Sequence, residues 1–401
     1  MDALKTKDFA SCIVVSISIL GTQLVGYNVV TLGVLVFALS LLFSPDCLVR
    51  QVRIVPAFIA FLLLSISSGL YFVLCDGSSM WTVMYWGQFY FFCFALLAVR
   101  NKPQLFRTLT FCVYAIFAAD LFTNLLLLVG VHIPWSELPN VRPGETMSRF
   151  TGVKGNTLYS GSISFIAIAL FLEEKLQRRW LYAIILALMV LNLSLAGSFR
   201  YLIVFAVVVT MRFLPFMRRK LFLSLMYIGS VIVVILATRF TMFLSLSNFY
   251  RFMIWDHFVA IILREPWWGH GYHCIHLDDS LDYSINHLIA SGVTESCVLL
   301  IAFNFGVIVL ALFLFSIVST LLRTSRYVRY TAQAGIFVGL SLDLFWGGSF
   351  DNALSLCLML LAWYIINTDS HNPLGKDAPT NNPDKPSTQI EPQVLASAQA
   401  D

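Results

Sequence analysis

Residues 296–318 read SCVLLIAFNFGVIVLALFLFSIV, an apolar run without a single charged side chain. A helix that crosses the hydrocarbon core of a bilayer needs about 20 mainly apolar residues, and comparable runs follow one another from Phe9 to Asn367. Hydrophobic residues make up 58% of the 401 positions and charged residues only 12%, whereas a soluble domain has roughly 25% charged residues. This composition excludes an ordinary water-soluble fold.

The succession of apolar runs predicts an all-α fold, a polytopic transmembrane helix bundle of about twelve spans. The first run comes after Lys5 and Lys7, and no small-residue cleavage site follows it. We therefore interpret it as a retained helix and not as a signal peptide. The expected spans lie near residues 9–27, 29–44, 54–75, 81–99, 108–130, 158–172, 181–196, 201–216, 221–243, 296–318, 333–347 and 352–367.

The basic residues of the short loops set the orientation that we expect. If the amino terminus lies inside, each short basic loop falls on the cytoplasmic side, as the positive-inside rule requires. The long polar loops 131–157 and 244–295 then face outward from a membrane domain of residues 1–368. Residues 369–401 lack apolar periodicity and are expected to form a disordered tail. Both termini are therefore expected in the cytoplasm.

Several other classes of function find little support in the composition. The formal net charge is +4, but the basic residues sit in short loops and not on one surface, so we expect no nucleic-acid partner. The eight cysteines are scattered singly without a CxxC pair, which favours neither a disulfide framework nor a zinc site. His270, His273 and His276 could bind zinc, yet the glycines that flank His270 argue against a regular helix presenting them. We expect no metal and no cofactor.

The basic residues that fall in the expected outer regions act against the topological bias and need another explanation. They are Arg142, Arg149, Lys154, Arg200, Arg239, Arg251 and Arg264. As a group they indicate an anion site, although each one alone is also compatible with a headgroup anchor.

Arg200 is the most informative of these residues. It lies in Gly197-Ser198-Phe199-Arg200, at a very short turn between two apolar helices, where a charged group is costly and usually functional. A guanidinium recognises phosphate oxygens through planar, bidentate contacts. We therefore expect Arg200 to bind a lipid-linked diphosphate at the outer leaflet, and snorkelling to phospholipid headgroups is the alternative.

The second outer loop holds further candidates. Residues 250–263 have an amphipathic pattern that predicts a helix lying in the membrane interface. Trp255 on this segment could anchor the helix or stack on a carbohydrate. His287 could take a proton from a sugar hydroxyl, and a structural histidine is the alternative. Glu295, at the mouth of the next span, is the rival base.

Two acids, Asp120 and Asp343, stand alone within the expected spans. An ionisable side chain inside a membrane segment can act as a proton relay, or it can join neighbouring helices through hydrogen bonds. We favour the second interpretation for both residues.

Taken in order, the outward motifs resemble the O-antigen polymerase and ligase superfamily over roughly residues 140–365. The order of the motifs and their outward placement together carry the resemblance. The motifs are Arg149-Phe150-Thr151-Gly152 with Asn156, Gly197-Ser198-Phe199-Arg200, Arg251-Phe252-Met253-Ile254-Trp255, Pro266-Trp267-Trp268-Gly269-His270-Gly271, His287 and Asn304-Phe305-Gly306.

The resemblance implies a membrane-embedded, inverting glycosyltransferase of the bacterial inner membrane, with its active site on the periplasmic face. Its donor would be a glycan linked to undecaprenyl diphosphate, without a nucleotide sugar or a metal. Arg200 and Arg251 would bind the diphosphate, and His287 would activate the acceptor hydroxyl. The wider substrate-binding set comprises Arg149, Arg142, Arg264, Asn156, Trp255, His273 and Glu295.

Members of this superfamily differ in their acceptor. Polymerases join one lipid-linked glycan to another, and ligases transfer the finished chain to lipid A-core. Ligases typically carry a His-x-His-Asn motif, whereas here Ile285-Asn286-His287-Leu288 lacks the first histidine. We therefore favour a polymerase of O-antigen or exopolysaccharide, with a chain-length regulator as a further partner, and keep the ligase as the alternative. A flippase or transporter is the weakest alternative. Carriers place ionisable groups near the membrane midplane, whereas the expected spans here are nearly free of them apart from Asp120 and Asp343.

Overall fold

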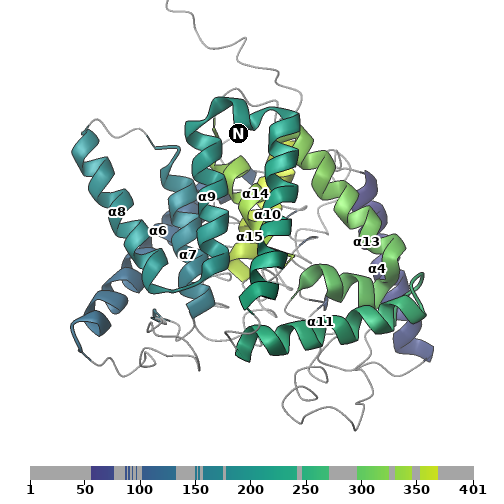
Figure 1. Ribbon diagram of the computed structural model, residues 1–401. Helices are drawn as coiled ribbons and strands as arrows, with labels where there is room; N and C mark the ends of the chain where they lie inside the picture. The colour runs from purple at the N-terminus through teal and green to yellow at the C-terminus, as the bar shows by residue number, and fades with distance from the viewer. Residues whose placement is uncertain are drawn as a thin grey trace, which may run out of the picture.

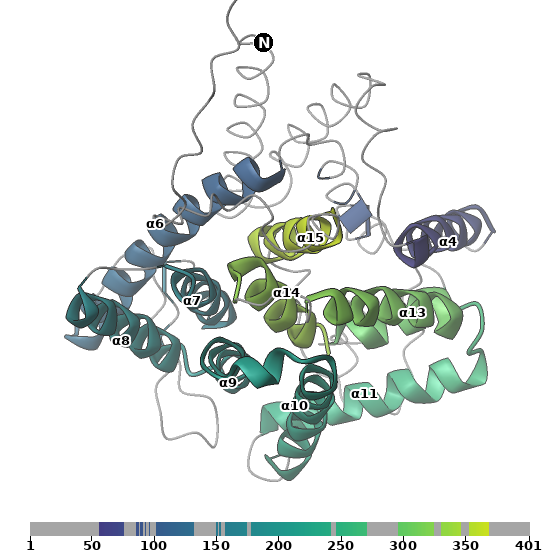
Figure 2. The ribbon, with the colours of Figure 1, turned by 90° about the horizontal axis from the view of Figure 1, so that it is seen from above.

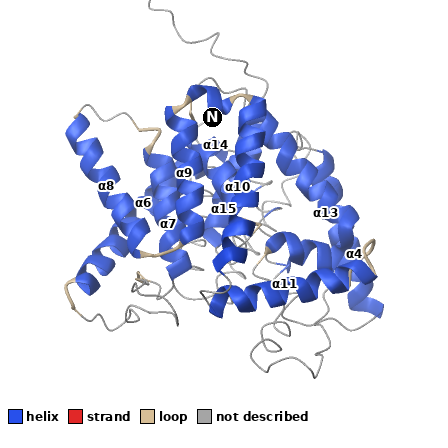
Figure 3. Cartoon of the chain, viewed as in Figure 1, coloured by secondary structure: helices blue, strands red, loops and turns tan. Residues whose placement is uncertain are grey.

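The computed structural model describes residues 56–75, 86–87, 89–90, 93, 96, 102–131, 150, 152–153, 157–174, 178–241, 246–270, 296–324, 330–345 and 353–368. All regular secondary structure in these ranges is helical (Figure 3). The all-α class expected from the sequence is thereby confirmed for the described part of the chain.

The helices coincide closely with the apolar runs of the sequence. Their bounds are α4 Pro56–Cys75, α6 Lys102–Leu128, α7 Thr157–Phe171, α8 Arg179–Leu195, α9 Phe199–Phe213, the 3-10 helix η1 Pro215–Arg218, α10 Lys220–Thr241, α11 Leu246–Arg264, α13 Cys297–Thr324, α14 Ala332–Asp343 and α15 Ala353–Thr368. The expected spans 9–27 and 29–44 and the tail 369–401 lie outside the described residues, as does most of the span 81–99.

Two of the described helices, α6 and α13, are long and apolar enough to cross a membrane by length and composition. Shorter apolar stretches occur at residues 57–71, 157–171, 179–195, 220–233 and 354–367. The α6 helix begins earlier than the expected span 108–130, because the basic segment that starts at Lys102 is already helical.

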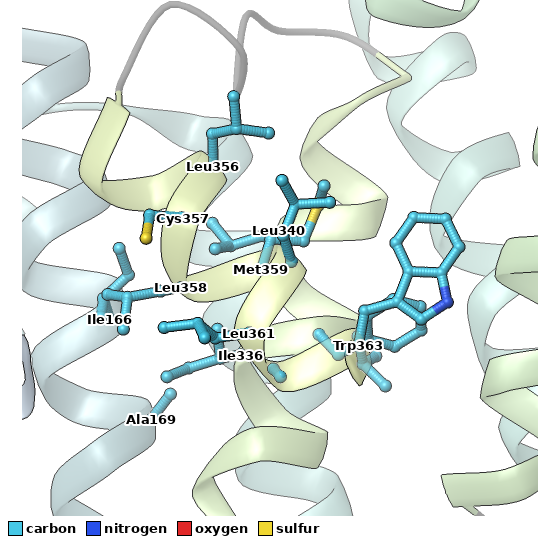
Figure 4. Packing of buried hydrophobic residues seen from close by; sticks show 14 of the residues in the cluster. Ile166, Ala169, Ile336, Leu340, Leu356, Cys357, Leu358, Met359, Leu361 and Trp363 are labelled. Atoms are coloured by element: carbon cyan, nitrogen blue, oxygen red, sulfur yellow. The ribbon is translucent and has the colours of Figure 1, made fainter. Parts of the chain in front are cut away.

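The α14 helix lies near the centre of the bundle and contacts α7, α9, α10, α13 and α15 (Figure 2). Figure 4 shows the packing at this centre, where Ile336 and Leu340 of α14 lie among Ile166 of α7 and Leu361 of α15. Gly339 permits the close approach of these helices, since a Cβ atom there would come within 2.1 Å of the Phe165 ring. The centre of the core is therefore made by α7, α14 and α15, which are buried on most sides.

Contacts between helix termini define one end of the bundle. The N–H of Val298, at the start of α13, donates to the carbonyl of Leu344 just after α14 over 3.3 Å. The N–H of Phe150 donates to the carbonyl of Leu195 at the end of α8 over 3.0 Å. The α11 helix runs across this end of the bundle (Figure 1). We call this end the α11 end.

Other contacts hold the opposite end of the bundle together. Arg212 donates through Nε to the carbonyl of Leu172 over 2.8 Å, and the Tyr330 hydroxyl donates to the carbonyl of Ala169 over 2.9 Å. Burial raises the pKa of Tyr330 well above its usual value, so this hydroxyl remains a neutral donor. The ends of α7 and α9 and the start of α14 therefore lie together at this opposite end.

Candidate functional site

Arg200 lies in the first turn of α9, directly after the turn from α8. The α8 helix ends at Leu195, and Gly197 adopts a φ of +61°, a conformation that glycine reaches without a steric penalty. The N–H of Gly197 donates to the carbonyl of Ser194 over 3.0 Å. Because so few residues separate α8 from α9, Arg200 is held at the α11 end.

Arg200 forms an ion pair with Asp343 at the end of α14. The distance between Arg200 Nε and Asp343 Oδ1 is 3.3 Å. The Arg200 side chain is 12% exposed, whereas that of Asp343 is fully buried. A buried carboxylate needs a partner because desolvation of its charge is expensive, and the guanidinium supplies that partner. The cation of the sequence motif is therefore joined to an acid that is distant in the sequence.

Tyr201 connects the two members of this ion pair. Arg200 Nη2 donates to the Tyr201 hydroxyl over 3.3 Å, and the hydroxyl donates to Asp343 Oδ2 over 3.2 Å. The guanidinium carbon of Arg200 also lies 4.8 Å from the centroid of the Tyr201 ring, within the range of a cation–π contact. The three side chains form one closed cluster, which we call the Arg200 cluster.

The α7 helix shapes the position of the Tyr201 ring. A Cβ atom at Gly161 would come within 2.7 Å of Tyr201 Cδ2, so only glycine allows this close approach. On the same helix, the Phe165 ring stacks on Tyr201 with a centroid distance of 6.4 Å and an interplanar angle of 17°. Neighbouring helices therefore restrict the Tyr201 ring, which in turn contacts the guanidinium.

A second polar cluster joins α6, α7 and α8, and we call it the Asp120 cluster. Asp120 Oδ2 accepts hydrogen bonds from Ser160 Oγ (2.5 Å) and Asn192 Nδ2 (3.0 Å). Asn192 also donates to Ser164 Oγ over 2.8 Å and accepts from Asn124 Nδ2 over 2.8 Å. All five side chains are fully buried. This cluster joins helices through hydrogen bonds, the role that the sequence indicated for Asp120.

The Asp120 cluster holds the backbone of the Arg149-Phe150-Thr151-Gly152 motif. The N–H of Gly152 donates to Asn124 Oδ1 over 3.0 Å, and the N–H of Val153 donates to Asp120 Oδ1 over 3.0 Å. Gly152 has a φ of +66°, and a Cβ atom there would come within 1.8 Å of Asp120 Oδ1. Only glycine can therefore lie against this carboxylate in this conformation.

A third contact joins two motifs at a break in α13. Gly306 has a φ of +82° and a ψ of 173°, which interrupts the helix that the sequence predicted as one continuous span. A Cβ atom at Gly306 would come within 2.1 Å of the carbonyl oxygen of Trp267, and one at Gly269 within 2.5 Å of the Gly306 nitrogen. The two backbones can approach this closely only because both positions are glycine.

Hydrogen bonds at the break replace part of the interrupted helical pattern. The N–H of Val307 donates to the carbonyl of Pro266 over 2.7 Å, and the N–H of His270 donates to the carbonyl of Phe303 over 2.8 Å. The His270 ring also stacks on Phe303 with a centroid distance of 5.0 Å. Backbone groups freed by a helix break must find partners when they lie away from water, and residues 266–270 supply them.

The α11 helix agrees with the amphipathic segment expected at residues 250–263. Ile254, Phe258 and Ile262 form one buried face that packs on Ala302 and Phe303 of α13. Consecutive members of this face are four residues apart, so they lie on one side of a helix. This contact attaches α11 to the first part of α13, on the amino-terminal side of the break.

Only part of the predicted site set lies within the described residues. Trp255 is half-buried in α11 and contacts Phe252 with a ring centroid distance of 5.4 Å. Arg251 belongs to α11, and Arg264 is its exposed last residue. The structure brings Arg200 together with Asp343 and Tyr201. The predictions that fall outside the described residues are those for His287, Arg149, Arg142, Asn156, His273 and Glu295.

Sequence reasoning missed several members of these clusters. Asp343 was treated as an isolated acid, and nothing near it in the sequence points to Arg200. Asn124 and Asn192 could have been found, because polar amides inside apolar spans form hydrogen bonds between helices. No model of a known protein family matches the chain, and no curated protein matches it. The resemblance to the O-antigen polymerase and ligase superfamily therefore remains a hypothesis about this chain.

Proposed function

We propose that this protein is an inner-membrane, inverting glycosyltransferase that polymerises oligosaccharide repeat units linked to undecaprenyl diphosphate. In this proposal, about twelve helices span the membrane, both termini lie in the cytoplasm, and the α11 end faces the periplasm. The O-antigen or an exopolysaccharide is the product. The motifs quoted above and the position of Arg200 support the proposal.

The outer surfaces of the described helices support membrane embedding. Large apolar side chains are widely exposed there, among them Phe111 and Phe122 of α6, Phe240 of α10 and Phe315 of α13, each at least 63% exposed. Extended apolar surface is rare on soluble monomers and marks contact with another apolar phase. Lipid chains are that phase in our proposal.

The arrangement of helix termini supports the proposed topology. Residues from both proposed periplasmic loops, Phe150 and His270, make hydrogen bonds at the α11 end or in the segments attached to it. Arg212 and Tyr330, which belong to the proposed cytoplasmic side, make their contacts at the opposite end. Helices that cross a membrane in alternating directions would place the loops of each side at one end in this way.

The observation that carries the proposed activity is the Arg200 cluster. A membrane protein gains nothing in stability from a cation that is almost wholly desolvated unless that cation is paired. Arg200 is paired, and it also keeps 12% of its side chain exposed at the α11 end. A permanently charged fork in that position suits the oxygens of a diphosphate.

The proposed reaction needs no metal or nucleotide. The acceptor hydroxyl oxygen attacks the anomeric carbon of the donor glycan, and the bond between that carbon and the diphosphate oxygen breaks with inversion. Arg200 and Arg251 stabilise the charge of the departing undecaprenyl diphosphate. His287 takes the proton of the acceptor hydroxyl, and Glu295 is the rival base. Arg149, Arg142 and Arg264 attract the anionic donor.

The deciding experiment compares surface lipopolysaccharide and the lipid-carrier pool in a strain lacking this protein with those in the same strain carrying the wild-type gene. If the protein is the polymerase, lipid A-core carries a single repeat unit and the polymer ladder disappears. Accumulation of long polymer on the carrier with a bare core would identify the ligase instead. Unchanged glycans in both pools would contradict both assignments.

Metal independence gives a second test of the same proposal. Transfer by the purified protein should continue unchanged after treatment with a chelator, because no metal takes part in the proposed step. Loss of transfer that zinc restores would favour the histidine-cluster hypothesis for His270, His273 and His276. A parallel assay of a known zinc enzyme in the same buffer is the control for effective chelation.

A further inference from the structure

We infer that Asp343 and Tyr201 are positioning residues, which orient the guanidinium plane of Arg200 for a diphosphate. The inference rests on the proposed function and deepens it, because it names the groups that make the anion site directional. The motif around Arg200 does not contain Asp343, which lies at the end of a helix far along the chain.

The contacts fix one edge of the guanidinium. Nε lies 3.3 Å from Asp343 Oδ1, and Nη2 lies 3.3 Å from the Tyr201 hydroxyl. Both atoms belong to the same side edge of the planar group. A guanidinium held along this edge cannot turn about its Cδ–Nε bond without breaking a contact. The edge formed by Nη1 and Nη2 is thereby directed away from Asp343.

The difference in burial separates the roles of the two charged residues. Asp343 is fully buried, so it is shielded from a ligand, whereas Arg200 retains 12% exposure. Asp343 therefore cannot contact an anion directly. Tyr201 is likewise buried, with 3% of its surface exposed, and its ring is restricted by Gly161 and Phe165. Contacts with residues of α7 and α14 therefore set the orientation of the Arg200 guanidinium.

Charge and geometry make opposite predictions for the loss of Asp343. If only net charge mattered, removing a carboxylate beside Arg200 would strengthen the binding of an anion. If the carboxylate orients the fork, its removal lets the guanidinium turn and weakens the bidentate contact. The sign of the change in affinity therefore distinguishes a positioning residue from a mere counter-ion.

The test measures binding of undecaprenyl diphosphate to the full-length protein purified in detergent. Asp343→Asn should weaken this binding by about tenfold, which corresponds to about 1.4 kcal/mol, although it removes a negative charge. Glu173→Gln is the matched control, because it also removes one carboxylate but lies at the opposite end, where Glu173 accepts a hydrogen bond from Ala332. The affinity of the control variant should remain that of the wild type.

Equal or tighter binding by folded Asp343→Asn would overturn the inference. Thermal unfolding of each variant in the same detergent shows whether it is folded. If Asp343→Asn does not fold, Asp343→Glu decides, because it keeps the charge and displaces the carboxylate. Positioning predicts weaker binding by Asp343→Glu, and wild-type affinity in that variant would overturn the inference. Failure of the wild-type protein to bind undecaprenyl diphosphate would instead contradict the proposed function itself.

Discussion

Asp120 and Asp343 occupy similar positions in the sequence, since each is an acid within an apolar helix, and each is fully buried. Their partners are different. Asp120 accepts hydrogen bonds from the neutral groups of Ser160, Asn192 and the Val153 backbone. Asp343 instead faces the cation of Arg200 and the Tyr201 hydroxyl.

This difference in partners indicates two roles for a buried acid. Asp120 connects helices, whereas Asp343 holds the cation of Arg200 in position. Several neutral donors can satisfy a buried carboxylate and connect helices without a cation. A buried ion pair is a poor source of stability compared with apolar packing, so its presence calls for another explanation. Our explanation for the Arg200–Asp343 pair is that it holds an oriented cation at the α11 end.

The largest expected effect is a slower glycan transfer when the guanidinium of Arg200 is replaced. Arg200→Lys keeps a positive charge near Asp343 but cannot make the bidentate contact. We expect transfer to fall by about 100-fold or more, the loss typical of one preorganised donor to a developing anion. The measurement is the initial rate of glycan transfer per folded molecule in proteoliposomes.

The matched variant for this prediction is Arg212→Lys. Arg212 also follows an apolar stretch of α9, but it donates to the Leu172 carbonyl at the opposite end of the bundle. It should retain a rate of the same order as the wild type. Wild-type transfer by Arg200→Lys would show that a point charge is sufficient. Asp343 would then have no guanidinium to orient, and its proposed difference from Asp120 would disappear.

A smaller effect, on stability, is expected from truncation of the other acid. Asp120→Ala leaves the donors on Ser160, Asn192 and Val153 without their common acceptor. We expect a loss of about 2–4 kcal/mol in the free energy of unfolding, because unsatisfied buried donors cost about 1–3 kcal/mol each and can partly relax. Thermal unfolding in detergent measures the loss.

Asp120→Asn provides the comparison, since its side-chain oxygen can still accept from some of these donors and it should be less destabilised than Asp120→Ala. Equal stability of Asp120→Ala and the wild type would mean that this cluster does not hold the helices together. The two acids would then not differ in the way proposed here.

The third effect is smaller and concerns the contact between Gly152 and Asp120. Gly152→Ala combines backbone strain at a φ of +66° with a Cβ atom 1.8 Å from Asp120 Oδ1. Gly130→Ala has the same type of strain at a φ of +80° but nothing within 4 Å of the added atom. Strain at a positive φ costs each variant about 1 kcal/mol. The overlap with Asp120 should cost Gly152→Ala about 1–2 kcal/mol more than Gly130→Ala.

The measurement for this pair is the difference between their unfolding midpoints under identical conditions. It isolates the carboxylate contact from the backbone term, which both variants share. Identical losses would show that the motif segment moves away from Asp120 without penalty. The anchoring of residues 152–153 by the Asp120 cluster would then be unimportant for stability.

Much of the helical architecture could be predicted from the sequence for a simple physical reason. A helix in an apolar environment requires a continuous apolar run, and such runs are visible without any knowledge of tertiary contacts. The expected spans 54–75, 158–172 and 181–196 each coincide with a helix whose ends differ by only a few residues. The interfacial pattern of residues 250–263 likewise corresponds to α11, Leu246–Arg264.

The polar contacts could not be predicted in the same way, because they depend on which helices become neighbours. Arg200 and Asp343 meet only because α9 packs against α14, and no local pattern specifies that packing. The break at Gly306 was also missed, since a single glycine in an apolar run is common. Its role becomes visible only when the Trp267 carbonyl is found where a Cβ atom would stand.

The smallest effect that still tests the comparison is the loss of one hydroxyl. Tyr201→Phe keeps both charges of the ion pair and removes only the group that joins them. Tyr330→Phe also deletes a buried hydroxyl with a hydrogen-bond partner, at the opposite end of the bundle. Each variant should lose about 1 kcal/mol of stability, and only Tyr201→Phe should also slow transfer, by several-fold. Equal transfer rates at matched stability would limit Tyr201 to packing, whereas a selective loss would show that the hydroxyl helps to orient the guanidinium.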